Sequence, residues 1–237
     1  MMRARVVAAT LLTTASLAAA PLAAQLVAGQ RDDFEDGTTQ GWTVGDPAHP
    51  LPPTNDATGG PAGAGDGYLL LRSVGGDGPG SRLSTVNVAQ WAGDYRTAGI
   101  GSITMDVANF GSSDVFLRLL WADPAMGPPT NVAVSSSGFL LTAGGGWQTV
   151  TFDLGPGGIT TLLGSGESAL RGATELRLFH NPAPVFLGPP NSSPPIVATL
   201  GLDNVTAVAV VPEPSTLLLL GSGLVLLPLL RRRRRTG

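Results

Sequence analysis

Acidic residues near the two ends of the chain are the strongest candidates for chemistry. Asp33, Glu35 and Asp36 lie close together near the start, and Asp203 lies near the end. Calcium and other hard cations bind several oxygen ligands at once. These four acids therefore predict a cation site, provided that the fold brings the two ends together. The alternative is that the acids are solvated or cap turns.

Aromatic side chains could bind sugars, because an exposed ring offers an apolar face on which a sugar can stack. We expect Trp91, Tyr95 and Trp121 to be such platforms, which makes them the candidate glycan contacts. Trp42 and Trp147 begin predicted strands and are expected in the core. Aromatic residues make up only 5% of the chain, so few can be spared from the core.

Residues suited to catalysis are few. His49 and His180 are the only histidines, too few for a zinc site unless carboxylates complete it. The serines lack the G-x-S-x-G context of a nucleophile elbow, although a Ser-His-Asp triad could still assemble in space. Paired carboxylates can hydrolyse glycosides, and the candidates are Asp106, Asp114, Asp123, Asp153, Glu167 and Glu175. We expect no enzyme activity; a secreted carbohydrate-active hydrolase or lyase is the alternative.

The charge argues against nucleic acid as a partner. Residues 25–210 contain seven arginines, no lysine and 16 acidic residues, a net charge of −9 (7 − 16). Such a body is repelled by nucleic acid and attracts cations. The chain has no cysteine, which excludes disulfides and thiolate metal sites.

Short alternating segments separated by glycine and proline predict the elements that position these residues. The expected strands are 68–72, 82–86, 103–110, 115–121, 130–136, 139–142, 147–154, 175–180 and 200–208, with two short strands between 32 and 44. We also expect a long surface loop at 45–67, a loop at 91–95 that folds back on the core, and one helical stretch at 159–170. No helical crossovers separate the strands, so the predicted fold is an all-β, antiparallel, jelly-roll-like β-sandwich.

Four short motifs occur along the body: Phe34-Glu35-Asp36-Gly37 with Gly41-Trp42, then Trp91 to Tyr95, Gly146-Trp147 with Thr151-Phe152, and Leu202-Asp203-Asn204-Val205. With these motifs the body resembles jelly-roll modules such as the laminin B domain and carbohydrate-binding modules. The resemblance implies that the first and last strands are neighbours and that a structural calcium joins them. Carried over, the metal ligands would be Glu35 and Asp203, with Asp33 and backbone carbonyls beside them.

The first 24 residues have the composition of a secretory signal peptide. Arg3 and Arg5 precede an alanine-rich apolar run that ends in small residues, the pattern that signal peptidase recognises. We expect cleavage after Ala24. Cleavage at residues 18–20 is the alternative, which the following Pro21 disfavours.

The C-terminus has three parts in a fixed order. Pro212-Glu213-Pro214 is followed by an apolar run of 14 residues (217–230) and by five arginines (231–235). The run is short for a permanent membrane span, which needs about 20 residues, and the arginines would stay on the cytoplasmic side. An ordinary single-span anchor is the alternative to a processing signal.

These residues resemble the PEP-CTERM sorting signal. The resemblance implies that an exosortase recognises Pro212, Glu213 and Pro214 and removes the tail, after transient anchoring in the inner membrane of a Gram-negative bacterium. It divides the chain into a signal peptide (1–24), a β-sandwich domain (25–210) and a sorting signal with an apolar helix (211–237). We therefore expect an exported surface or matrix protein whose non-catalytic sandwich is structural or adhesive, with exopolysaccharide as the expected glycan partner.

Overall fold

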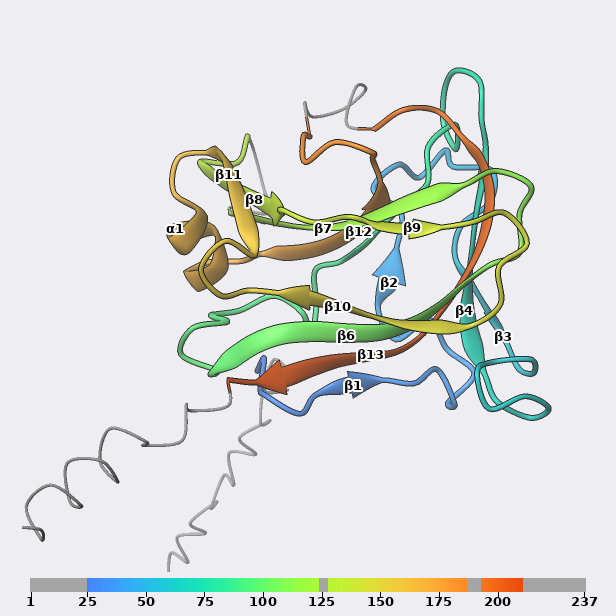
Figure 1. Cartoon of the computed structure of the whole chain (residues 1–237), viewed down its shortest axis with the longest axis horizontal. Helices are drawn as coiled ribbons and strands as arrows, with labels where there is room; N and C mark the ends of the chain where they lie inside the picture. Colours follow the sequence, from blue (N-terminus) through green and yellow to red (C-terminus); the bar gives the residue numbers. More distant parts are fainter. Residues whose placement is uncertain (1–24, 124–127, 187–192, 211–237) are drawn as a thin grey trace, which may run out of the picture.

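Two facing sheets of short strands form the body of the protein (Figure 1). The computed structural model describes residues 25–123, 128–186 and 193–210. Within these ranges lie 13 strands and one short helix, and the strands pair antiparallel throughout. The predicted all-β, antiparallel sandwich is confirmed. The predicted signal peptide and C-terminal apolar helix lie outside the described residues.

The first sheet carries both ends of the body. Its strands run in the order β10 (Gln148–Asp153), β6 (Ile100–Asn109), β13 (Val197–Ala209), β4 (Tyr68–Val74) and β3 (Thr54–Asp56), and β1 (Arg31–Asp32) also pairs with β13. The first and last strands, blue and red in Figure 1, are therefore neighbours, as the resemblance implied. β3 lies within residues 45–67, which we predicted to be a loop throughout.

The second sheet supplies the opposite wall of the core. Its order is β11 (Ile159–Leu163), β8 (Asn131–Ser135), β7 (Val115–Asp123), β12 (Glu175–His180), β5 (Ser84–Asn87) and β2 (Trp42–Thr43), and β9 (Phe139–Leu141) also pairs with β7. Side chains alternate between the two faces of a strand. In β7 this alternation sends Leu117, Leu119 and Trp121 into the core and leaves Arg118 and Leu120 on the outer face.

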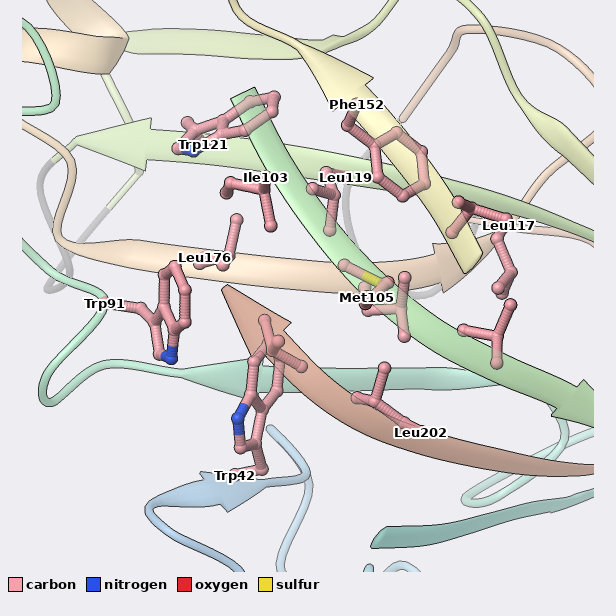
Figure 2. Packing of buried hydrophobic residues seen from close by; sticks show 14 of the residues in the cluster. Trp42, Trp91, Ile103, Met105, Leu117, Leu119, Trp121, Phe152, Leu176 and Leu202 are labelled. Atoms are coloured by element: carbon pink, nitrogen blue, oxygen red, sulfur yellow. The ribbon is translucent and has the colours of Figure 1, made fainter. Parts of the chain in front are cut away.

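One apolar cluster fills the space between the sheets (Figure 2). Leu119 and Trp121 of β7 belong to the same cluster as Ile103 and Met105 of β6, and each of these side chains is 0% exposed. Burial of apolar surface stabilises a fold by about 25 cal/mol per Å². In a chain without disulfides, this cluster is the main source of stability.

The helical stretch predicted at residues 159–170 is wrong in its first half. Ile159–Leu163 form the edge strand β11, and only Gly166–Arg171 form the helix α1. Gly164, with a φ of 57°, turns the chain between them, a conformation that glycine adopts without strain. Ser165 is the N-cap that starts the helix. Among the described residues, no helix is long and apolar enough to cross a membrane.

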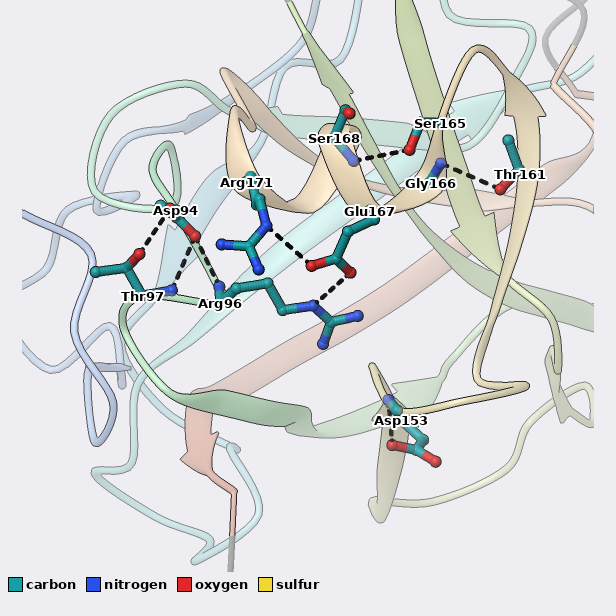
Figure 3. A network of polar contacts seen from close by, with 11 residues as sticks. Asp94, Arg96, Thr97, Asp153, Thr161, Ser165, Gly166, Glu167, Ser168 and Arg171 are labelled. Atoms are coloured by element: carbon teal, nitrogen blue, oxygen red, sulfur yellow. Dashed lines mark hydrogen bonds and ion pairs between the residues drawn. The ribbon is translucent and has the colours of Figure 1, made fainter.

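Local polar contacts hold α1 in its place (Figure 3). The Ser165 hydroxyl accepts the backbone N–H of Ser168 at 3.2 Å, which satisfies one of the free donors at a helix start. Glu167 pairs with Arg171 one turn later at 3.0 Å and with Arg96 from the loop before β6 at 2.9 Å. Each of these surface ion pairs adds little to the free energy of folding. Their effect is to orient the short helix.

A smaller apolar cluster lies on the outer face of the second sheet. Its members are Leu120, Ala122, Val132, Val134 and Phe179, with Leu162 and Phe186 packed against them. The buried guanidinium of Arg118 donates to the carbonyl oxygens of Ser135, Ser136, Asn181 and Pro182, each at 2.9 Å. The chain that follows β12 is thereby fixed against the sheet.

Candidate functional site

Asp203 lies on the outer face of the first sheet, since the preceding residue of β13 belongs to the core. It sits directly opposite Asp106 of β6 and is 1% exposed. Within the described part of the chain its carboxylate accepts one hydrogen bond, from the N–H of Asn204 at 2.7 Å. Burial raises the pKa of Asp203 to about 7, and the charges of Asp66 and Asp106 act in the same direction. A bound cation would compensate both the burial and the like charges.

Glu35 reaches the same region of the sheet. Its Oε1 accepts the N–H of Gly67 at 2.9 Å, and Gly67 immediately precedes β4. The pairing of β4 with β13 extends to Leu202, one residue before Asp203, so the backbone register supports the predicted neighbourhood of Glu35 and Asp203. A Cβ atom on residue 67 would lie 3.0 Å from the carbonyl oxygen of Phe34, and glycine permits this close approach.

The other predicted ligands have local partners. Asp33 accepts the N–H of Glu35 at 3.4 Å, and Asp36 accepts the N–H and hydroxyl of Thr38 at 2.8 Å each, as in an Asx turn. Across the described ranges, no three His, Asp or Glu side chains converge to hold a metal ion. A calcium ion would therefore bind through Asp203, Glu35 and backbone carbonyl oxygens, and this site stays a prediction.

The three predicted glycan contacts are wrong. Trp91, Tyr95 and Trp121 are each 0% exposed, so none can offer a ring to a sugar. The Tyr95 hydroxyl donates to the carbonyl of Trp91 at 2.8 Å, and its ring meets Trp121 edge-on with 6.1 Å between centroids. The loop at 91–95 folds back on the core, as predicted, and Trp121 faces inward with the alternate residues of β7.

Asp32 is a buried polar residue that sequence analysis missed. Its Oδ2 accepts both the indole N–H of Trp42 at 2.7 Å and that of Trp91 at 2.6 Å, and the amide of Gln90 donates at 3.2 Å. Burial raises the pKa of Asp32, although the hydrogen bonds from Trp91 and Trp42 act against this. The sequence presents Asp32 and Asp33 as adjacent acids, and nothing in it tells which of the two faces the core.

Two other aromatic rings lie at the surface instead. Phe110 is 44% exposed, and Trp147, which we expected in the core, is half-buried. Their centroids are 5.7 Å apart, and both rings pack edge-on against Tyr68. A Cβ atom on Gly201 would lie 2.6 Å from the Trp147 ring, so a glycine in β13 makes room for it. The Trp147 indole donates to the carbonyl of Gly59 at 2.9 Å, which fixes the ring.

A groove of about 610 Å³ lies at the edge of the second sheet. Residues of segments 44–49 and 78–82 form its sides, and Ser84 of β5 and Arg177 of β12 contribute from the sheet. Its polar side chains include those of Asp46, His49 and Arg82. The volume is within the range of small-molecule sites, about 300–1,000 Å³.

Two arginines in this groove are held in fixed positions. Arg177 donates to both carboxylate oxygens of Glu175, at 3.1 and 3.2 Å, and to the hydroxyl of Ser84 at 3.3 Å. Arg82 donates from Nε to the carbonyl of Ser193 at 2.6 Å. A planar guanidinium that is already fixed loses little freedom when it binds a hydroxyl or carboxylate. The groove is therefore suited to a polar ligand such as a sugar.

The C-terminal sequence matches a known processing signal. The family model for the PEP-CTERM protein-sorting motif matches residues 210–235. The chain carries a PEP-CTERM motif. Pro212, Glu213 and Pro214 fall within the matched range and lie outside the residues that the structure describes. The PEP-CTERM motif indicates an exported protein that an exosortase sorts.

The body of this PEP-CTERM protein has the fold of carbohydrate-binding modules. It is similar to a family 11 carbohydrate-binding module from Clostridium thermocellum, solved in complex with a β-1,3-1,4-mixed-linked tetrasaccharide, with a TM-score of 0.51 and 14% identity over 80% of this chain and 100% of that chain. It is also similar to an exo-β-agarase, with a TM-score of 0.52 and 13% identity over 77% of this chain and 25% of that chain. At these identities the likeness shows the fold alone. No curated protein matches the sequence.

The acids and histidines considered for catalysis have structural partners. Asp106 accepts from Thr149 and Asn204, Asp114 from Ala143, Asp123 from Thr130 and Asn131, and Asp153 from Gly155, while Glu167 and Glu175 form ion pairs. His49 lines the groove, and His180 is buried, with its Nδ1 accepting the N–H of Phe116 at 2.9 Å. Burial lowers the pKa of both histidines, so both are neutral at physiological pH.

Proposed function

We propose that this protein is exported by a Gram-negative bacterium, trimmed by an exosortase, and retained at the cell surface or in the extracellular matrix, where its sandwich binds polysaccharide without catalysis. The observation that carries the proposal is the combination, on one chain, of a PEP-CTERM motif with a body of carbohydrate-binding-module fold. The motif indicates that the body is exported. A solved module of this fold holds a tetrasaccharide, which supports a sugar as the ligand.

The groove at the edge of the second sheet is the binding site that we favour. Arg82 and Arg177 present fixed donors there, and Asp46 and Ser84 add an acceptor and a hydroxyl. Neighbouring sugar hydroxyls are both donors and acceptors, so a mixed set of this kind can satisfy them. A protein that holds matrix polysaccharide in this way has a structural or adhesive role.

A secreted carbohydrate-active enzyme is the second candidate. The observation in its favour is the likeness to an exo-β-agarase, although the match covers only 25% of that chain. Release of reducing ends from a matrix polysaccharide would favour this candidate. Binding without release would favour the non-catalytic role.

Replacing Pro212, Glu213 and Pro214 together by alanine should leave the tail on the protein and hold it at the inner membrane. The reason is that the PEP-CTERM resemblance makes these residues the recognition element, and they fall within the matched range. Intact-mass measurement of the exported, unaltered protein should show that residues 1–24 and the arginine tail are both absent. A mature exported protein that keeps residues 231–235 would contradict exosortase processing.

Replacing Arg82 by alanine should weaken polysaccharide binding at least tenfold, because a hydrogen bond from a charged donor contributes roughly 1.5–3 kcal/mol and about 1.4 kcal/mol is tenfold in affinity. Affinity electrophoresis in gels that contain exopolysaccharide from the host measures the effect. The matched control is Arg171→Ala, since Arg171 lies on α1 outside the groove with its side chain 56% exposed. Equal mobility of the two variants would show that the groove is not the site.

A further inference from the structure

The sorting motif begins inside the folded body. The matched range starts at Val210, and the backbone N–H of Val210 donates to the carbonyl of Gly99 at 2.8 Å. A Cβ atom on Gly101 would lie 3.1 Å from the Cα of Val210, so the chain is seated tightly against the start of β6. No linker separates the sandwich from the motif.

The contact of Val210 with the start of β6 limits the access of a processing enzyme to the motif. Pro212 is two residues beyond Val210, a reach of at most about 7 Å. Enzymes that bind extended peptides do so through main-chain hydrogen bonds over several residues. On the body side of Pro212 the N–H of Val210 is already bonded to Gly99.

The last residues of β13 are less buried than the rest of the strand. Ala207 is 0% exposed and is the last core residue of the strand. Val208 is half-buried, Ala209 is exposed, and Val210 is 56% exposed. The register with β6 shifts between Val208 and Ala209. Segments with few buried contacts and exposed hydrogen bonds open at the lowest free energy.

We propose that residues 208–210 leave β6 during processing and become the body-side part of the substrate that the exosortase binds, while β13 up to Ala207 stays in the sheet. Once residues 208–210 are released, Pro212 can lie up to roughly 17 Å from Ala207. No core side chain is exposed by this change. The end of β13 is thus part of the surface that the processing enzyme contacts. This inference rests on the proposed sorting by an exosortase.

The start and the end of the body lie at the same end of the sandwich, here called the pole. Before tail removal this pole must face the membrane. The N–H of Gly29 donates to the carbonyl of Ala207 at 2.7 Å, so the start of the body lies beside the end of β13 (Figure 1). Six residues lie between Val210 and Leu217, where the apolar run starts. They span at most about 25 Å, so this pole cannot be far from the bilayer before cleavage.

A disulfide lock tests the proposal in the full-length chain. Ser102 and Val208 are partners across β6 and β13, both half-buried on the outer face. Cross-strand Cα atoms lie about 4.5–5.5 Å apart, within the span of a disulfide. The chain has no other cysteine. In the oxidised Ser102→Cys/Val208→Cys protein the tail should no longer be removed, and a reductant should restore its removal. Pulse-chase labelling with gel mobility as the readout measures tail removal. Each single-cysteine variant should be processed like the unaltered chain.

An inserted spacer tests whether the disulfide blocks processing by limiting how far the motif can extend from the sheet. Inserting about four Gly/Ser residues between Val210 and Val211 adds roughly 14 Å and should restore tail removal in the locked protein. Processing of the locked chain at the normal rate, or no rescue by the spacer, would overturn the proposal. If alanine replacement of Pro212, Glu213 and Pro214 leaves processing unchanged, the proposed exosortase sorting fails instead.

Discussion

Replacing Asp32 by alanine should lower the free energy of unfolding of the body by about 4 kcal/mol. One oxygen of this buried carboxylate accepts the indole N–H groups of both Trp42 and Trp91. Removing it leaves two donors in the core without a partner, and each unsatisfied buried donor costs about 1–3 kcal/mol. Since domains are stable by roughly 5–15 kcal/mol, the loss is a large fraction of the total.

Urea unfolding followed by tryptophan fluorescence measures the change. Asp33→Ala is the matched control, because Asp33 is the adjacent acid, is half-buried, and makes only long contacts of 3.4 Å. We expect this control to cost less than about 1 kcal/mol. Asp32→Asn should fall between the two, since its amide oxygen can still accept an indole N–H while its amide nitrogen meets the donor of Gln90. Equal midpoints for Asp32→Ala and Asp33→Ala would contradict the role that we assign to Asp32.

Much of the fold could be predicted because its strands alternate cleanly. The segment 175–180 was predicted with the bounds that the structure gives β12. In β7 the alternation was also visible in the sequence, but it did not tell which side faces the core: Trp121, expected as an exposed platform, is buried. The helical interpretation of 159–170 failed because a threonine- and leucine-rich segment pairs with β8 at the sheet edge. Pairing with a neighbouring strand outweighed local propensity, and a sequence does not show where an edge strand finds its partner.

The candidate sites were less predictable. Whether an aromatic residue lies in the core or at the surface depends on tertiary packing, since Trp91 and Tyr95 are buried although they come from a loop. Trp147 lies on the outer face because Gly201, distant in sequence, leaves room there. Likewise the groove combines the segment before β3 with the turn before β5, and no local pattern links these two. The neighbourhood of Glu35 and Asp203 followed from a resemblance, whereas the pairing of Asp203 with Asp106 depends on a register that only the structure gives.

Adding calcium to the body, residues 25–211, should raise its melting temperature, and EDTA should lower it. Asp203 is 1% exposed, sits opposite Asp106 and accepts one hydrogen bond within the described residues. A cation held by Asp203, Glu35 and backbone carbonyls would offset the repulsion and join the start of the body to its last strand. A ligand that binds only the folded state stabilises it by about 2.7 kcal/mol at a hundredfold excess over Kd.

Asp203→Asn gives the sharpest test of this calcium prediction, because it keeps the shape of the side chain and removes the charge. The variant should be at least as stable as the unaltered body in EDTA, since it relieves the repulsion with Asp106 and Asp66. Its melting temperature should not respond to calcium, because a neutral amide is a weaker cation ligand than a carboxylate. Asp36→Asn is the matched control: this exposed acid bonds only to its own turn, so the response to calcium should persist. Identical melting curves of the unaltered body in calcium and in EDTA would show that Asp203 is a buried acid without a metal.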